Sequence, residues 1–174
     1  GSPYDHLMAG LVSFDITSEV DLPEVDNAIN QARKEVGQRY DFKGSKASIE
    51  FKKAENLLEL IADDDFKMEA VWELLLTRLV KRGVPVKNLK PSENETIGGG
   101  LVKRKVALQQ GIPIEAAKEI VKFLKDQKLK KVQATIQADQ VRISSPSKDA
   151  LQQTMRLLRA GDFGVELQFG NYRE

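Results

Sequence analysis

The chain has 174 residues, a net charge of +1, 41% hydrophobic residues and no cysteine. This length suits one ordinary domain or two compact domains of about 80 residues each. The absence of cysteine excludes disulfides, thiolate metal ligands and cysteine nucleophiles, and no apolar run approaches the roughly 20 residues of a membrane span. These features favour a cytoplasmic protein that makes no membrane contact.

The first ten residues show no periodicity and begin with the Gly-Ser that a cleaved expression tag often leaves. We therefore interpret residues 1–10 as a tag remnant. His6 is the only histidine of the chain and falls inside this segment. Catalytic triads, zinc sites and imidazole acid–base chemistry thus lack their usual residues. We predict a protein with no catalytic residues, no metal site and no cofactor.

The first half of the chain predicts strands from period-two alternation and helices from apolar stripes. Strands are predicted at residues 12–16, 47–51, 57–62 and, as a shorter element, 84–89. One helix should begin after the cap residue Asp21 and end near Gly37. A second should begin after the acidic caps at 63–65, turn Phe66 toward the core, and end at Gly83.

The same order of elements recurs in the second half of the chain. Predicted here are a polar linker at 90–100, strands at 102–108, 132–137, 141–144 and 165–169, and helices at 114–124 and from Ser147 to Gly161. Pro113 corresponds to Pro23, and the pair at 150–151 corresponds to that at 70–71, so the chain contains an internal repeat.

Each half therefore follows the order βαββαβ, which is typical of a ferredoxin-like domain. The predicted fold is α+β, with two such domains in tandem at 11–95 and 101–174, each an antiparallel sheet with helices on one face. The other face of each sheet is open, and function is expected there. In the second half this face should carry cations and amides, or be simply a solvated polar surface. The residues are Lys103, Lys105, Gln133, Thr135, Arg142 and Gln168.

Charge is distributed unevenly between the two halves of the sequence. Residues 1–100 carry a net −5 and residues 101–174 a net +6. The C-terminal half is therefore the expected side for contact with an anion such as RNA.

The segment 39–46, between the first helix and the second strand, combines cations, aromatic rings, a glycine and a hydroxyl group. Lysine and arginine can meet a phosphate, backbone and hydroxyl groups can donate to it, and an aromatic ring can stack on a base. Because the GxxxxGK[ST] spacing is missing, an ordinary helix-to-strand connection is the alternative. The candidate ligand-binding residues here are Arg39, Phe42, Lys43, Gly44, Ser45 and Lys46.

Arg159 lies at the equivalent end of the last helix, before Gly161 and Gly164, and is a further candidate together with Lys105 and Arg142. Glycines at this position are also common helix-stop residues. The three glycines at 98–100 precede a strand and not a helix, so we interpret them as a flexible linker.

Several motifs together closely resemble the bacterial YajQ-like nucleotide-binding proteins, over residues 12–174. They are Ser13-Phe14-Asp15-Ile16, Ser18-Glu19-Val20-Asp21, Asp41-Phe42-Lys43-Gly44-Ser45-Lys46, Lys81-Arg82-Gly83 and Leu167-Gln168-Phe169-Gly170-Asn171-Tyr172-Arg173. The resemblance implies two tandem ferredoxin-like domains, and it leaves open an exchange of their first strands. It also implies a non-enzymatic role in binding nucleotides, in some members cyclic di-GMP with effects on transcription, and RNA in others.

The leading hypothesis is a cytoplasmic nucleotide-binding regulatory protein that senses cyclic di-GMP or another guanine or adenine nucleotide and acts through a protein partner such as a transcription regulator. The alternative is an RNA-binding module that uses the basic second half. The sequence contains neither the RxxxR and DxSxxG pair nor an RxxD inhibitory-site pattern typical of cyclic di-GMP sites, and the strands at 57–62 and 141–144 lack RNA-recognition aromatics.

Overall fold

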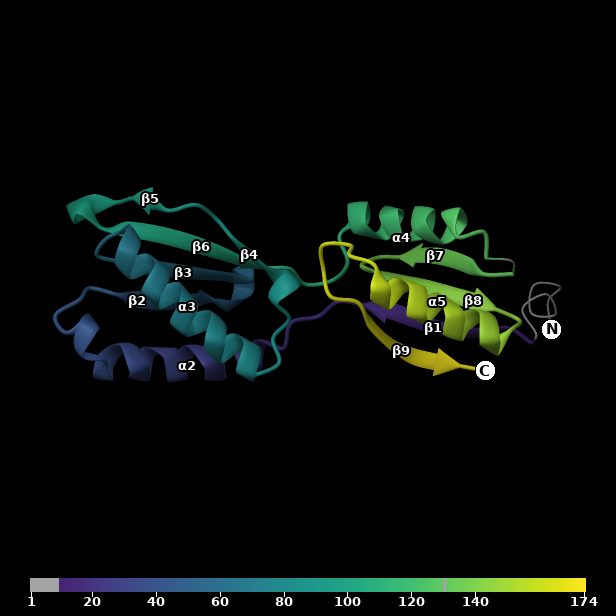
Figure 1. The fold of residues 1–174 in the computed structure, drawn as a ribbon, viewed down its shortest axis with the longest axis horizontal. Coiled ribbons are helices and arrows are strands. Elements are labelled where there is room, and N and C mark those ends of the chain that lie inside the picture. Colours follow the sequence, from purple (N-terminus) through teal and green to yellow (C-terminus); the bar gives the residue numbers. More distant parts are fainter. Residues whose placement is uncertain (1–9, 130) are drawn as a thin grey trace. The chain divides into compact units, whose positions relative to one another are not determined.

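The structure is a computed structural model that describes residues 10–129 and 131–174 (Figure 1). The predicted tag remnant lies outside the described residues except for Gly10. Within the described residues the chain forms four α-helices and two antiparallel sheets, which confirms the α+β class. In the same residues no helix combines the length and the apolar character needed to cross a bilayer.

The bounds of the elements are as follows. The helices are α2 (Leu22–Gln38), α3 (Asp65–Lys81), α4 (Ile114–Asp126) and α5 (Lys148–Ala160). The strands are β1 (Val12–Thr17), β2 (Ser48–Lys52), β3 (Leu57–Ala62), β4 (Leu89–Pro91), β5 (Glu95–Thr96), β6 (Val102–Leu108), β7 (Gln133–Gln137), β8 (Gln140–Ser145) and β9 (Gln168–Arg173). Short 3-10 turns are η1 (Tyr40–Phe42), η2 (Lys53–Glu55), η3 (Val86–Asn88) and η4 (Gly98–Gly100).

Three helices begin at capping side chains. The Asp21 carboxylate accepts from the backbone N–H of the third residue beyond it, and Asp64 and Ser147 do the same in α3 and α5. These contacts satisfy backbone donors that a helix N-terminus leaves without a partner, and they confirm the predicted helix starts. At the other end, α2 runs through Gly37 to Gln38, one residue beyond the predicted stop.

The chain forms two compact units that are not simply its two halves. One is Val20–Gln110, and the other joins the chain up to Glu19 with Gly111–Glu174. The reason lies in strand pairing, since β1 pairs with β8 and β9, and β6 pairs with β3 and β4 (Figure 1). The first strand of each sequence half therefore completes the sheet of the other half, and the linear division at 95–101 does not coincide with the compact units.

The Val20–Gln110 unit has the strand order β2-β3-β6-β4, with β5 also paired to β6. Helices α2 and α3 pack together, α2 against β2 and α3 against β3 and β6. Alternate residues of β3 and β6 point into this core, including Leu58, Leu60 and Val106, all fully buried. The neighbouring side chains Lys103 and Lys105, predicted for the sheet of the second half, belong instead to this sheet.

The second unit has the strand order β7-β8-β1-β9, with α4 packed on β7 and α5 on β8 and β1. Its core is built around Phe14 and Ile16 of β1, which are fully buried. The ring of Phe14 meets that of Phe169 edge to face, with ring centroids 5.6 Å apart. Strand β9 begins at Gln168, so the strand predicted at 165–169 is displaced toward the C-terminus.

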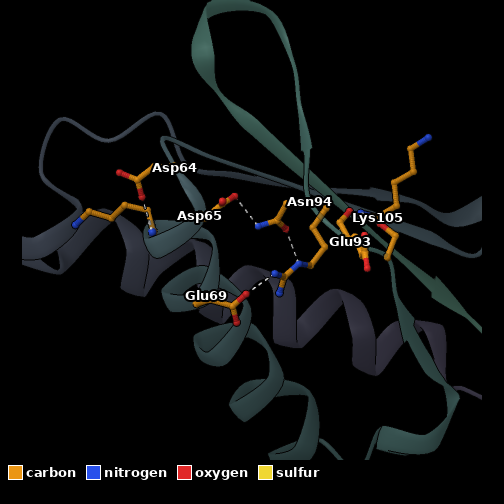
Figure 2. Close-up of polar contacts among 9 residues, drawn as sticks. Asp64, Asp65, Glu69, Glu93, Asn94 and Lys105 are labelled. Carbon is orange, nitrogen blue, oxygen red and sulfur yellow. Dashed lines mark hydrogen bonds and ion pairs between the residues drawn. The ribbon is translucent and has the colours of Figure 1, made fainter.

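The predicted linker at 90–100 is wrong. The end of strand β4 and all of β5 fall in this range and pair with β6, and the glycines of η4 form the turn into β6. Asn94 is held from two sides: its amide donates to Asp65 (3.0 Å; Figure 2), and its oxygen accepts from Arg104 (2.8 Å). Arg104 also pairs with Glu69 of α3. A polar, proline-bearing segment is well suited to an edge strand, which explains the error.

The predicted inward position of Phe66 is also wrong, because this side chain is 81% exposed. Phe66 is the second residue of α3, and the apolar stripe of that helix begins only at Met68. The strand predicted at 84–89 is likewise replaced by the 3-10 turn η3, and β4 starts at Leu89.

Candidate functional site

A pocket of about 560 Å³ lies in the Val20–Gln110 unit, between the end of α2, the loop containing η1, the start of β2 and one residue of α3. This volume is within the range of small-molecule sites. The residues that line it are Arg33, Val36, Gly37, Phe42, Lys43, Gly44, Ser45, Ala47, Ser48, Ile49 and Val71. Four of the six candidates from the segment 39–46 are therefore brought together at one cavity.

The pocket combines an apolar interior with cations. Phe42, Ile49 and Val71 are buried and belong to the hydrophobic core of the unit. Arg33 and Lys43 are exposed. An apolar surface beside a few charged groups is the usual composition of a site for a small organic anion.

Arg33 is held in place by the edge of the sheet. Its Nε and Nη2 donate to the carbonyl oxygen of Ile49 at 3.1 and 2.5 Å, and Nη1 donates to Asn30 Oδ1 at 3.5 Å. Because β2 is an edge strand, this contact also covers part of a backbone edge that would otherwise be open. The guanidinium is thus fixed at the pocket wall.

Lys43 follows η1 in a tight turn. Its backbone N–H donates to the carbonyl of Tyr40 (3.0 Å), and the N–H of Ser45 donates to that of Phe42 (2.9 Å). Gly44 between them has φ of +74°, which a glycine adopts without strain. In the described part of the chain, no carboxylate lies within ion-pair distance of the Lys43 ammonium, so its charge is available to a ligand.

Ser45 lines the pocket and is also hydrogen-bonded within the protein. Its hydroxyl donates to Asp63 Oδ2 and accepts from the backbone N–H of Ala47 (3.1 Å). The backbone N–H of Lys46 donates to Asp63 Oδ1 (3.2 Å). The hydrogen bond from Ser45, followed by that from Lys46, holds the pKa of Asp63 below its ordinary value. The single hydroxyl proton of Ser45 is thus directed to Asp63.

Phe42 lies between two cations. The residue is 3% exposed, with the Arg39 guanidinium carbon 5.1 Å and the Lys67 ammonium 5.3 Å from the ring centroid. The ring contributes to the pocket wall, but it does not offer the exposed face that base stacking requires. In contrast, the neighbouring Tyr40 is 87% exposed.

The other two candidates of this segment do not line the pocket. The Arg39 side chain forms a two-point ion pair with Asp41, with N–O distances of 3.0 and 2.7 Å. Lys46 is exposed. These two side chains therefore belong to the outside of the loop.

The three remaining candidates are distributed over the two units. Lys105 lies on β6, and Figure 2 shows its side chain extending away from Glu69 and Asn94. Arg142 and Arg159 belong to the other unit. Arg142 Nε donates to Asp15 Oδ1 (2.9 Å), and the Arg159 guanidinium carbon lies 5.0 Å from the ring centroid of Phe169.

Sequence reasoning missed Arg33 and the apolar lining residues other than Phe42. Arg33 precedes Gly37 by four residues, so the two lie on one face of α2. The spacing could have predicted this shared face, but only the packing of α2 beside β2 shows that the face borders a pocket.

The net charge of each unit differs from that of each sequence half. The unit containing Gly111–Glu174 has 11 basic and 11 acidic side chains, and Val20–Gln110 has 16 and 15. The charge asymmetry of the sequence disappears because β6, with three consecutive cations, belongs to the Val20–Gln110 unit.

The pocket holds no carboxylate and no imidazole among its lining residues within the described chain. It offers apolar contact, an arginine and a lysine, and both cations can hold an anion through charge-assisted hydrogen bonds. Fold and site together define an α+β protein with a pocket suited to a small organic anion.

Comparison with known proteins gives the family. The family described as "Nucleotide-binding protein YajQ-like" matches residues 12–173, and the chain belongs to it. A nucleotide-binding protein of Elusimicrobium minutum is 50% identical over 161 residues, covering 92% of this chain and 98% of that protein. One of Trichlorobacter lovleyi is 49% identical, covering 93% and 99%. One of Bacillus cytotoxicus is 48% identical, covering 95% and 100%. The resemblance noted from the motifs is confirmed.

Proposed function

We propose that this chain is a non-enzymatic regulatory protein that binds a nucleotide in the pocket of the Val20–Gln110 unit. The observation that carries the proposal is the pocket itself, where Arg33 and Lys43 lie beside an apolar wall that includes Phe42, Ile49 and Val71. The name of the family and of its curated relatives supports a nucleotide as the ligand.

In this proposal the phosphate of the nucleotide meets Lys43 and the outer nitrogen atoms of Arg33. Arginine and lysine both form strong charge-assisted hydrogen bonds to phosphate oxygens. The base or sugar packs on the apolar wall near Ile49 and Val71. Without a carboxylate or imidazole among the described lining residues, binding and not turnover is the expected outcome.

The proposal also covers the type of domain and a regulatory role. We propose that each unit is a ferredoxin-like domain whose first strand comes from the other half of the sequence, since both strand orders fit that arrangement. A protein partner such as a transcription regulator would then recognise the nucleotide-bound form. Cyclic di-GMP is one candidate ligand among guanine and adenine nucleotides.

The proposal is tested by calorimetric titration of the tag-free protein with GTP, ATP, cyclic di-GMP and a short single-stranded RNA. Saturable binding of one nucleotide at about unit stoichiometry and micromolar affinity is expected. If none of the three nucleotides binds, the proposed function is wrong.

Replacing Lys43 by alanine is expected to weaken the affinity for the bound nucleotide by about tenfold, because one charge-assisted contact to phosphate is lost. The double variant Lys43→Ala with Lys46→Ala should weaken it by no more than a further small factor, since Lys46 lies outside the pocket lining. Lys34→Ala is the matched control: Lys34 is an exposed lysine of α2 that does not line the pocket, and its replacement should leave affinity unchanged.

The RNA alternative is tested by the same titration. The charge argument for RNA binding was the basic C-terminal half of the sequence. This argument is weakened because the two compact units carry similar net charges. An RNA interface driven by phosphate contacts should lose affinity steeply between about 50 and 200 mM salt. RNA binding with that dependence, and no nucleotide binding, would favour the RNA module.

A further inference from the structure

The connection from β3 to α3 holds the loop that lines the pocket. Asp63 follows β3, and its two carboxylate oxygens accept separately from the Ser45 hydroxyl and from the Lys46 backbone N–H. The Ser45 oxygen in turn accepts from the N–H of Ala47 at 3.1 Å. A single carboxylate thereby fixes three consecutive residues, of which Ser45 and Ala47 line the cavity.

A second contact joins the same two segments. Lys67, in the first turn of α3, donates through Nζ to the backbone carbonyl of Asp41, and its ammonium lies against the ring of Phe42. Both ends of the loop around Lys43 are thus tied to the chain at 63–67. The capping of α3 is a separate task, since Asp64 performs it.

The Asp63 carboxylate places a negative charge close to a site proposed to bind an anion. Because that charge would not attract the ligand, we expect the carboxylate to act by ordering the loop. The carboxylate receives two hydrogen bonds from the loop, and its pKa is lowered mainly by that from Ser45. It is therefore ionised at neutral pH and remains an acceptor for both donors. A loop that is already ordered avoids the entropic cost of ordering when a ligand binds.

We propose that Asp63 is the positioning residue of the nucleotide pocket: its carboxylate holds Ser45, Lys46 and Ala47 in the conformation that places Lys43 at the cavity. This inference rests on the proposed function, because it assigns Asp63 a role in the same site. Asp63 itself does not line the pocket and acts only through the loop.

Residue-resolved amide hydrogen exchange of the free protein tests the anchor without any ligand. Asp63→Ala should speed exchange at the amides of Lys46 and Ala47 by about tenfold, since both are protected through this carboxylate. Asp65→Ala is the matched control: Asp65 is two residues away with the same charge, and its recorded side-chain contact is to Asn94. It should leave these two amides unchanged. Asp63→Asn, which keeps the shape of the side chain, should give a smaller effect in the same direction.

Titration with GTP, ATP and cyclic di-GMP tests the consequence for binding. Asp63→Ala should weaken the nucleotide bound by the wild-type protein by about tenfold, and Asp65→Ala should not. Adding Ser45→Ala to Asp63→Ala should cause little further loss, because the Ser45 hydroxyl donates to Asp63. Additive losses would contradict action through the loop.

The remaining outcomes separate the inference from the proposed function. Unchanged exchange at Lys46 and Ala47 in Asp63→Ala overturns the inference even if Lys43→Ala weakens binding as expected. Faster exchange with unchanged affinity overturns the positioning role and leaves the proposed function intact. If the wild-type protein binds none of the three nucleotides, the proposed function fails and the inference fails with it.

Discussion

Replacing Phe14 by alanine is expected to destabilise the unit that contains Gly111–Glu174 by about 3–5 kcal/mol, the usual cost of removing a fully buried aromatic ring. Phe14 is 0% exposed, and its ring packs edge to face on that of Phe169. Although this residue stands near the start of the chain, β1 is paired with β8 and β9. Native-state hydrogen exchange should therefore show lost protection in β8 and β9, with β2 and β3 protected as before.

The reciprocal variant is Leu108→Ala in β6. Leu108 is buried in the core of the Val20–Gln110 unit, so its truncation should cost about 2–5 kcal/mol and deprotect β3 and β4 while β8 and β9 keep their protection. The two variants together report the exchange of first strands. Loss of protection in β2 and β3 on replacing Phe14 would contradict the pairing described above.

Replacing Asp15 by alanine is expected to lower the free energy of unfolding of the unit that contains Gly111–Glu174 by about 2–3 kcal/mol. The Asp15 carboxylate is 5% exposed and accepts from Arg142 (2.9 Å) and from the Asn171 amide (2.6 Å), while Arg173 lies 3.5 Å away. Its removal leaves two arginines without their shared counter-charge and one amide donor without an acceptor. The estimate is below the 3–5 kcal/mol typical of a broken buried pair because water reaches Arg142, which is 30% exposed. Urea unfolding gives the difference directly.

Two further measurements check the cause of this loss. Arg142→Ala in the Asp15→Ala background should cost less than Arg142→Ala alone, because the residues share one contact. The pKa of Asp15 is lowered first by the hydrogen bond from Arg142. Its contribution to stability is therefore fully present above the unfolded value of about 4 and is lost as pH falls through the lower folded value. The gap between the wild type and Asp15→Ala should close on acidification; a constant gap would exclude this carboxylate as the source.

Local chemistry made much of the fold predictable. Capping side chains such as Asp21 and Ser147 act within three residues, so the starts of α2 and α5 could be inferred from the sequence. The periodicity of β1 and β6 was equally clear. The pairing partners of these two strands could not be predicted, because period-two alternation indicates which face of a strand is buried but not which sheet the strand joins. The family resemblance left an exchange of first strands open. The structure adds the pairing of β1 with β8 and of β6 with β3, which the sequence pattern could not predict.

The candidate site was also predictable only in part, because local composition indicates a loop but not the long-range packing around it. The composition of the segment 39–46 indicated a ligand loop, and Phe42, Lys43, Gly44 and Ser45 do line the cavity. Arg33 escaped notice because its position depends on α2 packing beside the edge strand β2. Composition also could not show that Arg39 is paired with Asp41, or that Ser45 donates to Asp63. A cation or hydroxyl in a sequence motif is not necessarily free to meet a ligand.

The exchange of first strands also sets an order for folding during synthesis. The Val20–Gln110 unit is continuous, so it can form as soon as its own residues have left the ribosome. Strand β1 must wait, since Asp15 and its partner Arg142 are 127 residues apart. At about 5–20 residues per second this leaves the apolar face of β1 without its sheet for roughly 6–25 s. Strand β1 is thus synthesised long before its partners β8 and β9, and during that interval the side chains of Phe14 and Ile16 have no sheet to complete.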